Sequence, residues 1–430
     1  MNIELKTLGD VCENISRPFD FSNHQEVVFI NTGDVFDGKF LHKDYFEKED
    51  LPGQAKKAVQ REDILFSEIR PINKRFAFVD EDCDEYVVST KFMVLKTNDE
   101  VIPKYLYHYL KCDNTIKNLQ KEAESRSGTF PQITFDAISY FSIPIPTIRE
   151  QERIVTFIDN IEKQIEYNQK INETLNEVAR TLFKSWFIDF DPVRAKAEGR
   201  STGLSKEVSD LFPDSFEDSE LGEIPKGWSK SIITDIANRI SDKYKKDEDW
   251  SNERLIDLSR MPSNSISLNS YGRGDELSTS VCKFKKYDFL FGSIRPYFYK
   301  AGICPYNGVS NTSVFILRAK KSYDREFMYF YLSSNVTFQR SVQYSEGTKM
   351  PIIKWNDFEE FPFALPNEEL RKQFSSIINP VIEKIILNID KQKVLSELRD
   401  TLLTKIISGE LRIPDSEKFL RKQGFNVTDY

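Results

Sequence analysis

The strongest constraint on the fold is that the chain repeats itself. The segment Asp63–Pro71 (DILFSEIRP) recurs in the second half of the chain as Asp288–Pro296 (DFLFGSIRP). Gly128–Pro131 (GTFP) likewise matches Gly347–Pro351 (GTKMP). Solenoid repeats have periods of roughly 20–50 residues, whereas this period covers about half of the chain. It therefore indicates the duplication of a whole domain.

Each copy is predicted to end in a long helix. Residues 149–187 contain no Pro or Gly, and apolar residues recur at alternating spacings of four and three, as in a coiled-coil seam. The first seam runs from Ile154 to Trp186, and a matching seam runs from Phe374 to Ile406 in the second copy. Arg399 and Pro380 interrupt the second seam, and Pro380 is expected to kink that helix or to shift its start.

Two amides lie at the centre of each seam, and they form a possible polar layer between the helices. They are Asn168 and Asn172 in the first seam, and Asn388 and Gln392 in the second. Antiparallel pairing would bring Asn168 near Gln392 and Asn172 near Asn388, whereas parallel pairing would align Asn168 with Asn388. Both arrangements suit the amides, and they could also be ordinary surface-facing polar positions. The duplication favours antiparallel pairing, because it relates the two halves by a pseudo-twofold axis.

The regions before the helices read as mixed α/β globules. Short apolar runs such as Glu85–Val88 and Ser313–Leu317 lie between turn signals and predict strands, and short helices are expected at Lys104–Lys111 and Arg325–Leu332. Residues 188–228 show little periodicity and predict an extended linker. The expected fold is therefore α+β, with two mixed α/β globular domains separated by two long antiparallel coiled-coil helices in a pseudo-twofold internal duplication.

The composition of the chain excludes few functions. The 430 residues carry a formal net charge of −8, which counts against a simple DNA-binding protein but does not exclude local basic patches. A cytosolic protein that binds no nucleic acid would have the same composition. The five scattered cysteines and the lack of a signal-like N-terminus or a long apolar run favour a reducing cytoplasm, with no zinc site and no membrane.

Four segments resemble type I restriction-modification enzyme specificity (S) subunits, and together they extend the resemblance over essentially the whole chain. They are Leu182–Lys196 (LFKSWFIDFDPVRAK), the pair Leu211–Phe216 (LFPDSF) and Ser219–Trp228 (SELGEIPKGW), the junction Ile143–Pro146 with Glu150 and Gln151, and the ending Leu402–Leu411. The second copy departs from the pattern at its own junction, where Pro362–Pro366 reads PFALP and Gln373 lies two residues beyond the position equivalent to Gln151. The helix entry, and any partner contact there, can therefore differ between the copies.

The resemblance implies a protein that reads DNA without catalysing a reaction itself. It implies target-recognition domains at residues 1–147 and 225–366, spacer helices at 148–190 and 367–412, a linker at 191–224 and a tail at 413–430. The implied partners are double-stranded DNA, two modification (methyltransferase) subunits and restriction subunits that act as ATP-dependent translocase and nuclease. S-adenosylmethionine, ATP and Mg²⁺ would bind those partners and not this chain.

The first candidates for DNA contact are two matched arginines. Arg70 and Arg295 each follow a strand-like run and precede Pro, which ends the strand and turns the chain into a loop. Arginine can bond a guanine edge or a phosphate through two parallel hydrogen bonds. The alternative is that each arginine bonds groups of its own domain. The loops continue with further candidates: Asn73, Lys74 and Arg75 in the first, and Tyr297, Tyr299 and Lys300 in the second.

The matched Gly-Thr turns are the second group of candidates for DNA contact. Ser125, Arg126, Gly128 and Thr129 offer hydroxyl, backbone N–H and cationic groups that suit phosphate oxygens. The matched turn contributes Gly347, Thr348 and Lys349 but also carries a glutamate. The alternative is a plain turn before a strand.

No catalytic or metal-binding motif is evident in the sequence. It lacks a Gly-x-Gly-x-x-Gly loop, an Asn-Pro-Pro-aromatic tetrad and a Walker A loop, and its three histidines have no metal-ligand spacing. We therefore expect no catalytic, cofactor-binding or metal-binding residue. The rival functions are a coiled-coil scaffold without DNA contact and a duplicated nuclease or methyltransferase.

Overall fold

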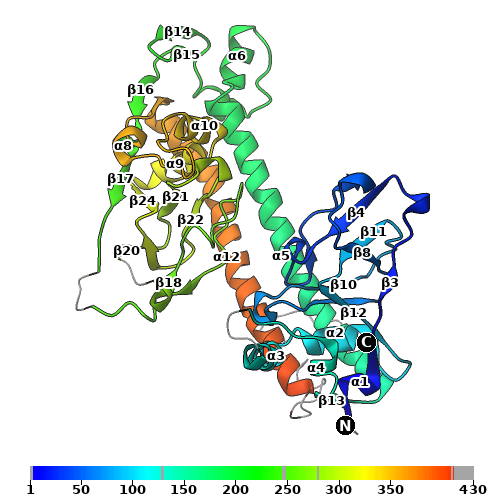
Figure 1. Ribbon diagram of the computed structural model, residues 1–430. Helices are drawn as coiled ribbons and strands as arrows, with labels where there is room; N and C mark the ends of the chain where they lie inside the picture. The colour runs from blue at the N-terminus through cyan, green and yellow to red at the C-terminus, as the bar shows by residue number, and fades with distance from the viewer. Residues whose placement is uncertain (1–2, 127–129, 245–247, 278–279, 408–409, 411–430) are drawn as a thin grey trace. The chain divides into compact units, whose positions relative to one another are not determined.

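The computed structural model describes residues 3–126, 130–244, 248–277, 280–407 and 410 (Figure 1). It divides into two compact units, one of residues 1–164 with 395–430 and the other of residues 165–394. The limits between these units fall inside the two long helices, α5 (Ile148–Phe187) and α12 (Glu368–Ile407). Among the described residues, no helix is both apolar enough and long enough to cross a membrane.

The globular part of the first unit contains two main sheets and short helices. One sheet has the strand order β10-β9-β12-β2, and the other has the order β3-β8-β11-β4-β7. The strands are β1 (Glu4–Thr7), β2 (Cys12–Asn14), β3 (Arg17–Pro18), β4 (Glu26–Ile30), β5 (Val35–Phe36), β6 (Lys39–Phe40), β7 (Tyr45–Glu47), β8 (Ala55–Ala58), β9 (Ile64–Ser67), β10 (Phe76–Phe78), β11 (Tyr86–Ser89), β12 (Phe92–Thr97) and β13 (Ser142–Ile145). The helices are α1 (Leu8–Val11), α2 (Pro103–Leu110), α3 (Asp113–Arg126) and α4 (Phe135–Ile138).

The second unit repeats most of this topology. Its sheet β22-β21-β24-β17 matches β10-β9-β12-β2, and the pair β16-β25 matches β1-β13. Its other sheet, β19-β18-β23-β20, keeps the parallel pair and both flanking strands of the first unit but has four strands among the described residues where the first unit has five. The strands are β14 (Phe216–Ser219), β15 (Gly222–Pro225), β16 (Ser229–Ile232), β17 (Ala237–Ile240), β18 (Arg254–Leu255), β19 (Gly272–Arg273), β20 (Val281–Phe284), β21 (Phe289–Gly292), β22 (Ala301–Ile303), β23 (Gly308–Asn311), β24 (Val314–Ala319) and β25 (Pro362–Leu365). The helices are α6 (Asp191–Ala197), α7 (Lys206–Ser209), α8 (Ile233–Ile236), α9 (Arg325–Leu332), α10 (Asn335–Gln343) and α11 (Trp355–Phe358).

Within the second unit, α5 and α12 pack side by side in opposite directions (Figure 1). The amide nitrogen of Asn388 donates to the side-chain oxygen of Asn172 at 2.8 Å, and the Asn172 amide donates to the backbone oxygen of Ile385 at 3.1 Å. Further along, the Phe374 ring lies 5.9 Å from that of Trp186. A later residue of one helix therefore meets an earlier residue of the other. The predicted fold class and its antiparallel helices are confirmed.

Pro380 does not shift the start of α12, which runs unbroken from Glu368 through the proline to Ile407. The tolerance has a physical reason. Proline removes one donor from the helix ladder, and Pro380 lies within a helix held by an extensive buried face that includes Ile378, Ile382 and Ile385.

The prediction of an extended linker is wrong. The connector folds into α6, α7 and the β14-β15 hairpin. Its residues Val193, Phe212 and Ile224 are buried in the same apolar cluster as Trp186 of α5 and Phe374 of α12. These apolar side chains show no local period in the sequence, because their burial comes from tertiary contacts within this cluster. The connector is therefore part of the core of the second unit.

Candidate nucleic-acid interface

The two predicted arginines lie on equivalent loops. Arg70 follows β9 and begins a short 3-10 turn, Pro71–Asn73, while Arg295 follows β21 and begins the turn Pro296–Phe298. Both prolines are buried and anchor the start of their turns. The strand β9 and the strand β21 are buried throughout, so each loop extends from a rigid base.

The same backbone hydrogen bonds fix both loops. The N–H of Arg70 donates to the Pro131 oxygen at 3.1 Å, and the N–H of Arg295 donates to the Pro351 oxygen at 2.7 Å. The bridge between Ile69 and Gln132 likewise recurs between Ile294 and Ile352. The arginine loop and the segment after the Gly-Thr turn are therefore adjacent in each copy, although they lie far apart in the sequence.

Both arginines adopt a left-handed backbone conformation, which non-glycine residues rarely take. The φ angle is 42° at Arg70 and 48° at Arg295. The residue that ends each turn is also left-handed, with φ of 52° at Lys74 and 53° at Tyr299. Two copies with different neighbouring residues keep the same unfavourable conformation. Such strain is retained where the surrounding structure enforces it, and it clusters at functional sites.

The two arginine side chains have different surroundings. Arg70 is exposed, and its guanidinium lies 5.9 Å from the centre of the Phe130 ring. Arg295 is half-buried and donates to the backbone oxygen of Lys349 at 3.3 Å. Among the described residues, the buried Nε of Arg295 has no hydrogen-bond partner. The Arg295 guanidinium therefore makes one hydrogen bond within its own unit, and its Nε–H remains a donor without an acceptor among the described residues.

The neighbours of Arg70 stand at the surface of the first unit. Asn73 is exposed, while the Lys74 ammonium bonds Asp113 at 3.0 Å. Arg75 is half-buried, and its backbone oxygen accepts from the N–H of Ser67 at 2.9 Å. Of these three residues, Asn73 is the most accessible to a ligand.

The neighbours of Arg295 divide into one exposed ring and two groups bonded within the protein. Tyr297 is exposed. The Tyr299 hydroxyl donates to the side-chain oxygen of Asn335 at 3.0 Å, and the Lys300 ammonium donates to the backbone oxygen of Leu258 at 2.6 Å. Tyr299 and Lys300 thus hold the loop in its own unit. Any contact of theirs with DNA stays a prediction.

The Gly-Thr turns are only partly described. Arg126 bonds Glu122 at 2.9 Å, and the Ser125 hydroxyl donates to the backbone oxygen of Glu122 at 2.8 Å. Gly128 and Thr129 lie outside the described residues. In the second copy, Gly347, Thr348 and Lys349 are all exposed, and Gly347 has φ of 99°, a conformation that favours glycine.

Sequence reasoning missed the exposed apolar side chains around both arginines. Ile72 and Phe130 flank Arg70, and Tyr297 and Met350 hold the matched positions around Arg295. The signal was available, because the repeat already aligned Ile72 with Tyr297 and the residue before Pro131 with the residue before Pro351.

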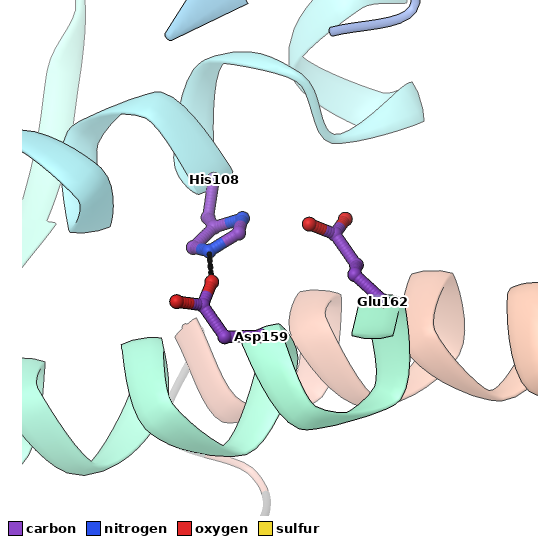
Figure 2. Close-up of side chains that lie close together, drawn as sticks. All are labelled: His108, Asp159 and Glu162. Atoms are coloured by element: carbon purple, nitrogen blue, oxygen red, sulfur yellow. Dashed lines mark hydrogen bonds and ion pairs between the residues drawn. The ribbon is translucent and has the colours of Figure 1, made fainter. Parts of the chain in front are cut away.

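Sequence reasoning also missed a cluster of charged groups around the buried His108 in the first unit (Figure 2). His108 of α2 points toward Asp159 and Glu162 of α5, and its Nε2 lies 2.9 Å from the Asp159 carboxylate. The signal in the sequence was weak: two acidic residues three apart on one helix. The histidine comes from another element, 51 residues before Asp159.

Both carboxylates of this cluster already have cationic partners. Lys104 bonds Asp159 at 2.7 Å, Lys111 bonds Glu162, and Arg399 of α12 lies 3.4 Å from Glu162. His, Asp and Glu can ligate a metal ion, but three nearby cations would repel one. The cluster instead fastens the globular part of the first unit to both helix segments of that unit.

Burial determines the protonation of the cluster. Removal from water lowers the pKa of His108 below its ordinary value, and the neighbouring Lys111 lowers it further. Burial also acts to raise the pKa of Asp159, but hydrogen bonds from His108 and Lys104 outweigh it and keep that pKa below the ordinary value. We therefore assign a neutral imidazole whose Nε2 donates to an ionised Asp159.

Comparisons with known proteins agree with this architecture. The profile of the type I restriction modification DNA specificity domain matches twice, at residues 2–177 and 225–397. The specificity subunit of the type I restriction enzyme HindI from Haemophilus influenzae is 33% identical over 464 aligned positions, which cover 94% of this chain and 98% of that protein. The MjaIX specificity subunit from Methanocaldococcus jannaschii is 27% identical and covers 74% of this chain and 71% of its own length.

A solved structure supports the fold. The S subunit of a type I restriction-modification system from M. genitalium superposes with a TM-score of 0.50 at 14% identity, covering 95% of this chain and 96% of that one. The two profile matches coincide with the two structural copies, each a globule with most of its helix. The chain belongs to the family of type I restriction-modification specificity subunits, which contain DNA specificity domains and are not themselves catalytic.

Proposed function

We propose that the chain reads a DNA target in two parts, one half-site for each copy of the recognition domain. The observation that carries this proposal is the arginine loop, which both copies build with the same hydrogen bonds and the same left-handed backbone. The loop places one arginine, with its capacity for paired hydrogen bonds to a base or a phosphate, at equivalent sites of two globules.

We propose further that the chain carries this recognition to catalytic partners. The relatives are subunits of type I restriction enzymes, and a related solved structure concerns the assembly of such a system. The expected partners are two modification subunits and the restriction subunits. In this proposal, S-adenosylmethionine binds the modification subunits, while ATP and Mg²⁺ bind the restriction subunits.

The test maps methylated bases in the genome of a host that carries this chain with its modification subunits. The expected result is a single motif of two specified blocks separated by a constant number of unspecified base pairs. A host that lacks only this chain serves as the control and should lose that motif. One contiguous block, or methylation that persists without the chain, would contradict the proposal.

A further inference from the structure

Each copy exposes large apolar side chains close to its arginine, and at two positions matched by the repeat both copies do so. In the first unit they are Ile72, 50% exposed, and Phe130, 51% exposed. In the second they are Tyr297, 42% exposed, and Met350, 50% exposed. We call these the apolar tips. Phe298 and Ile352 are exposed in the second copy as well, but their matches in the first copy are the polar residues Asn73 and Gln132.

The duplication makes the apolar tips informative. Single exposed apolar residues are common on protein surfaces and need no explanation. Here the loop sequences have diverged, since Asn73 corresponds to Phe298 and Lys74 to Tyr299. Both tip positions nevertheless remain large, apolar and exposed, with a different residue type in each copy.

The backbone presents the tips in a fixed geometry. One tip residue lies in the 3-10 turn directly after the arginine, and the other directly precedes the proline whose oxygen accepts the arginine N–H. The N–H groups of Asn73 and Phe298, which follow the tips Ile72 and Tyr297, donate back to their arginine oxygens at 2.8 and 3.0 Å. A rigid loop loses little conformational entropy on binding, so its exposed apolar area can contribute to affinity.

We propose that the apolar tips contact DNA bases beside each arginine and supply a part of the affinity that does not depend on salt. This inference rests on the proposed function. The apolar surfaces of DNA are its base faces and the methyl groups of thymine, which lie in the grooves, whereas the phosphates are charged. A side chain such as Ile72 or Met350 therefore gains binding free energy from contact with a base and not from contact with the DNA backbone.

The charges around the tips favour DNA over a protein partner for this surface. The arginine of each copy bonds the proline that follows one tip and lies two residues before the other, and exposed Lys349 adjoins Met350. Cations beside apolar groups match the groove of a duplex, where phosphates line both edges. A modification subunit that covered the tips would instead need to satisfy these cations with its own acidic groups.

The test compares single variants in the complex assembled with modification subunits. Ile72→Ser and Tyr297→Ser should each weaken binding to the target duplex about tenfold. The slope of log affinity against log salt should stay at the wild-type value, because no cation is removed. Each variant should relax base preference in one half-site only.

Two further variants serve as controls. Leu5→Ser removes an exposed leucine from β1, which pairs with β13 and not with the sheet that contains β9 and leads into the Arg70 loop. This variant should leave DNA binding unchanged. Lys349→Ala should reduce the salt slope by about one without changing base preference, if that lysine contacts a phosphate.

The outcomes separate the inference from the proposed function. Wild-type complex that shows no sequence-specific binding would overturn the proposed function itself. If the wild-type complex binds its target specifically but both serine variants bind with unchanged affinity, the inference about the apolar tips is wrong while the proposed function stands. A changed salt slope in the serine variants has the same consequence. Loss of modification subunits from the serine variants would assign the tips to a protein contact, and that also overturns the inference.

Discussion

At the scale of single residues, Arg70 allows the cleanest test of base reading. It is exposed and caps a strained turn, whereas Arg295 also bonds the backbone of its own unit. We expect Arg70→Ala to weaken specific binding by about 1–3 kcal/mol and to relax one half-site. The measurement is a titration against the target duplex and against duplexes with single changed base pairs.

Arg61→Ala is the matched control for Arg70, because Arg61 is exposed at the other end of the same strand, β9. It should leave base preference unchanged. Equal weakening of all sequences by Arg70→Ala would make Arg70 a phosphate contact. Unchanged binding with a lower free energy of unfolding would show that Arg70 has a structural role.

His108 gives the first unit a predictable response to pH. Its pKa is lowered in the folded chain, so below pH of about 6.5 the unfolded chain binds a proton that the folded chain does not. The unfolded state then gains stability, and the free energy of unfolding should fall as pH drops, by up to about 1.4 kcal/mol per pH unit. Urea titrations at pH 7.5, 6.5 and 5.5 measure this slope.

His108→Gln is the informative variant. Its amide can donate to Asp159 in place of Nε2 but does not titrate. The variant should lose the pH dependence between 6.5 and 5.5. A slope equal to that of the wild type would show that a group other than His108 is responsible.

At the scale of elements, the hydrogen-bonded amides Asn172 and Asn388 join α5 to α12. We expect Asn172→Leu to lower the free energy of unfolding by about 1–3 kcal/mol, because it leaves the fully buried Asn388 without its acceptor. The double variant Asn172→Leu/Asn388→Leu should recover most of that loss, since two apolar groups then face each other. Equilibrium urea unfolding of the two single variants and the double variant forms the required cycle.

The double variant also tests whether the amides specify the register. A buried polar pair fixes helix register at a cost in stability. The double variant should therefore be stable but less uniform, which would appear as broadened unfolding transitions. Two single substitutions whose effects simply add would contradict coupling between the amides.

The folded connector is tested by Phe212→Ala. Phe212 is buried, and its ring meets that of Trp186 at 5.1 Å. Truncation should lower the free energy of unfolding of the second unit by about 3–5 kcal/mol, as for other buried phenylalanines. Leu221→Ala, at a half-buried position in the hairpin turn, should cause a smaller loss. An unchanged free energy of unfolding in Phe212→Ala would contradict the buried connector and would support the prediction of an extended linker.

The sequence predicted those elements that have a local period. The strands β11 and β24 and the helices α2 and α9 lie where apolar runs and spacing placed them. The two seams predicted a pair of long helices, and the duplication favoured the antiparallel arrangement. Phe212 carried no such signal, because its burial depends on contact with Trp186, which belongs to an earlier helix. The His108 cluster was hidden for the same reason, since α2, α5 and α12 each supply part of it.

At the scale of the whole molecule, the duplication predicts that recognition is modular. Replacing residues 1–147 with the corresponding domain of another family member should change one half-site and leave the other intact. Methylation mapping of hosts that carry the chimeric chain measures the outcome. The reciprocal chimera, with residues 225–366 replaced, is the matched control and should change the opposite half-site. Changes in both blocks would refute independent reading.

The division of the chain into units has a consequence for its synthesis. The second unit is one continuous stretch, residues 165–394, whereas the first needs residues 395 onward as well as 1–164. Glu162 of α5 obtains its partner Arg399 only when the last part of α12 has been made. On the ribosome, the domain that emerges first is thus completed last. A chain that stops early at residue 394 would contain a complete second unit and a first unit that lacks the buried α12 residues Leu402, Leu403 and Ile406. We expect such a chain to expose apolar surface in its first unit and therefore to aggregate more readily than the full chain.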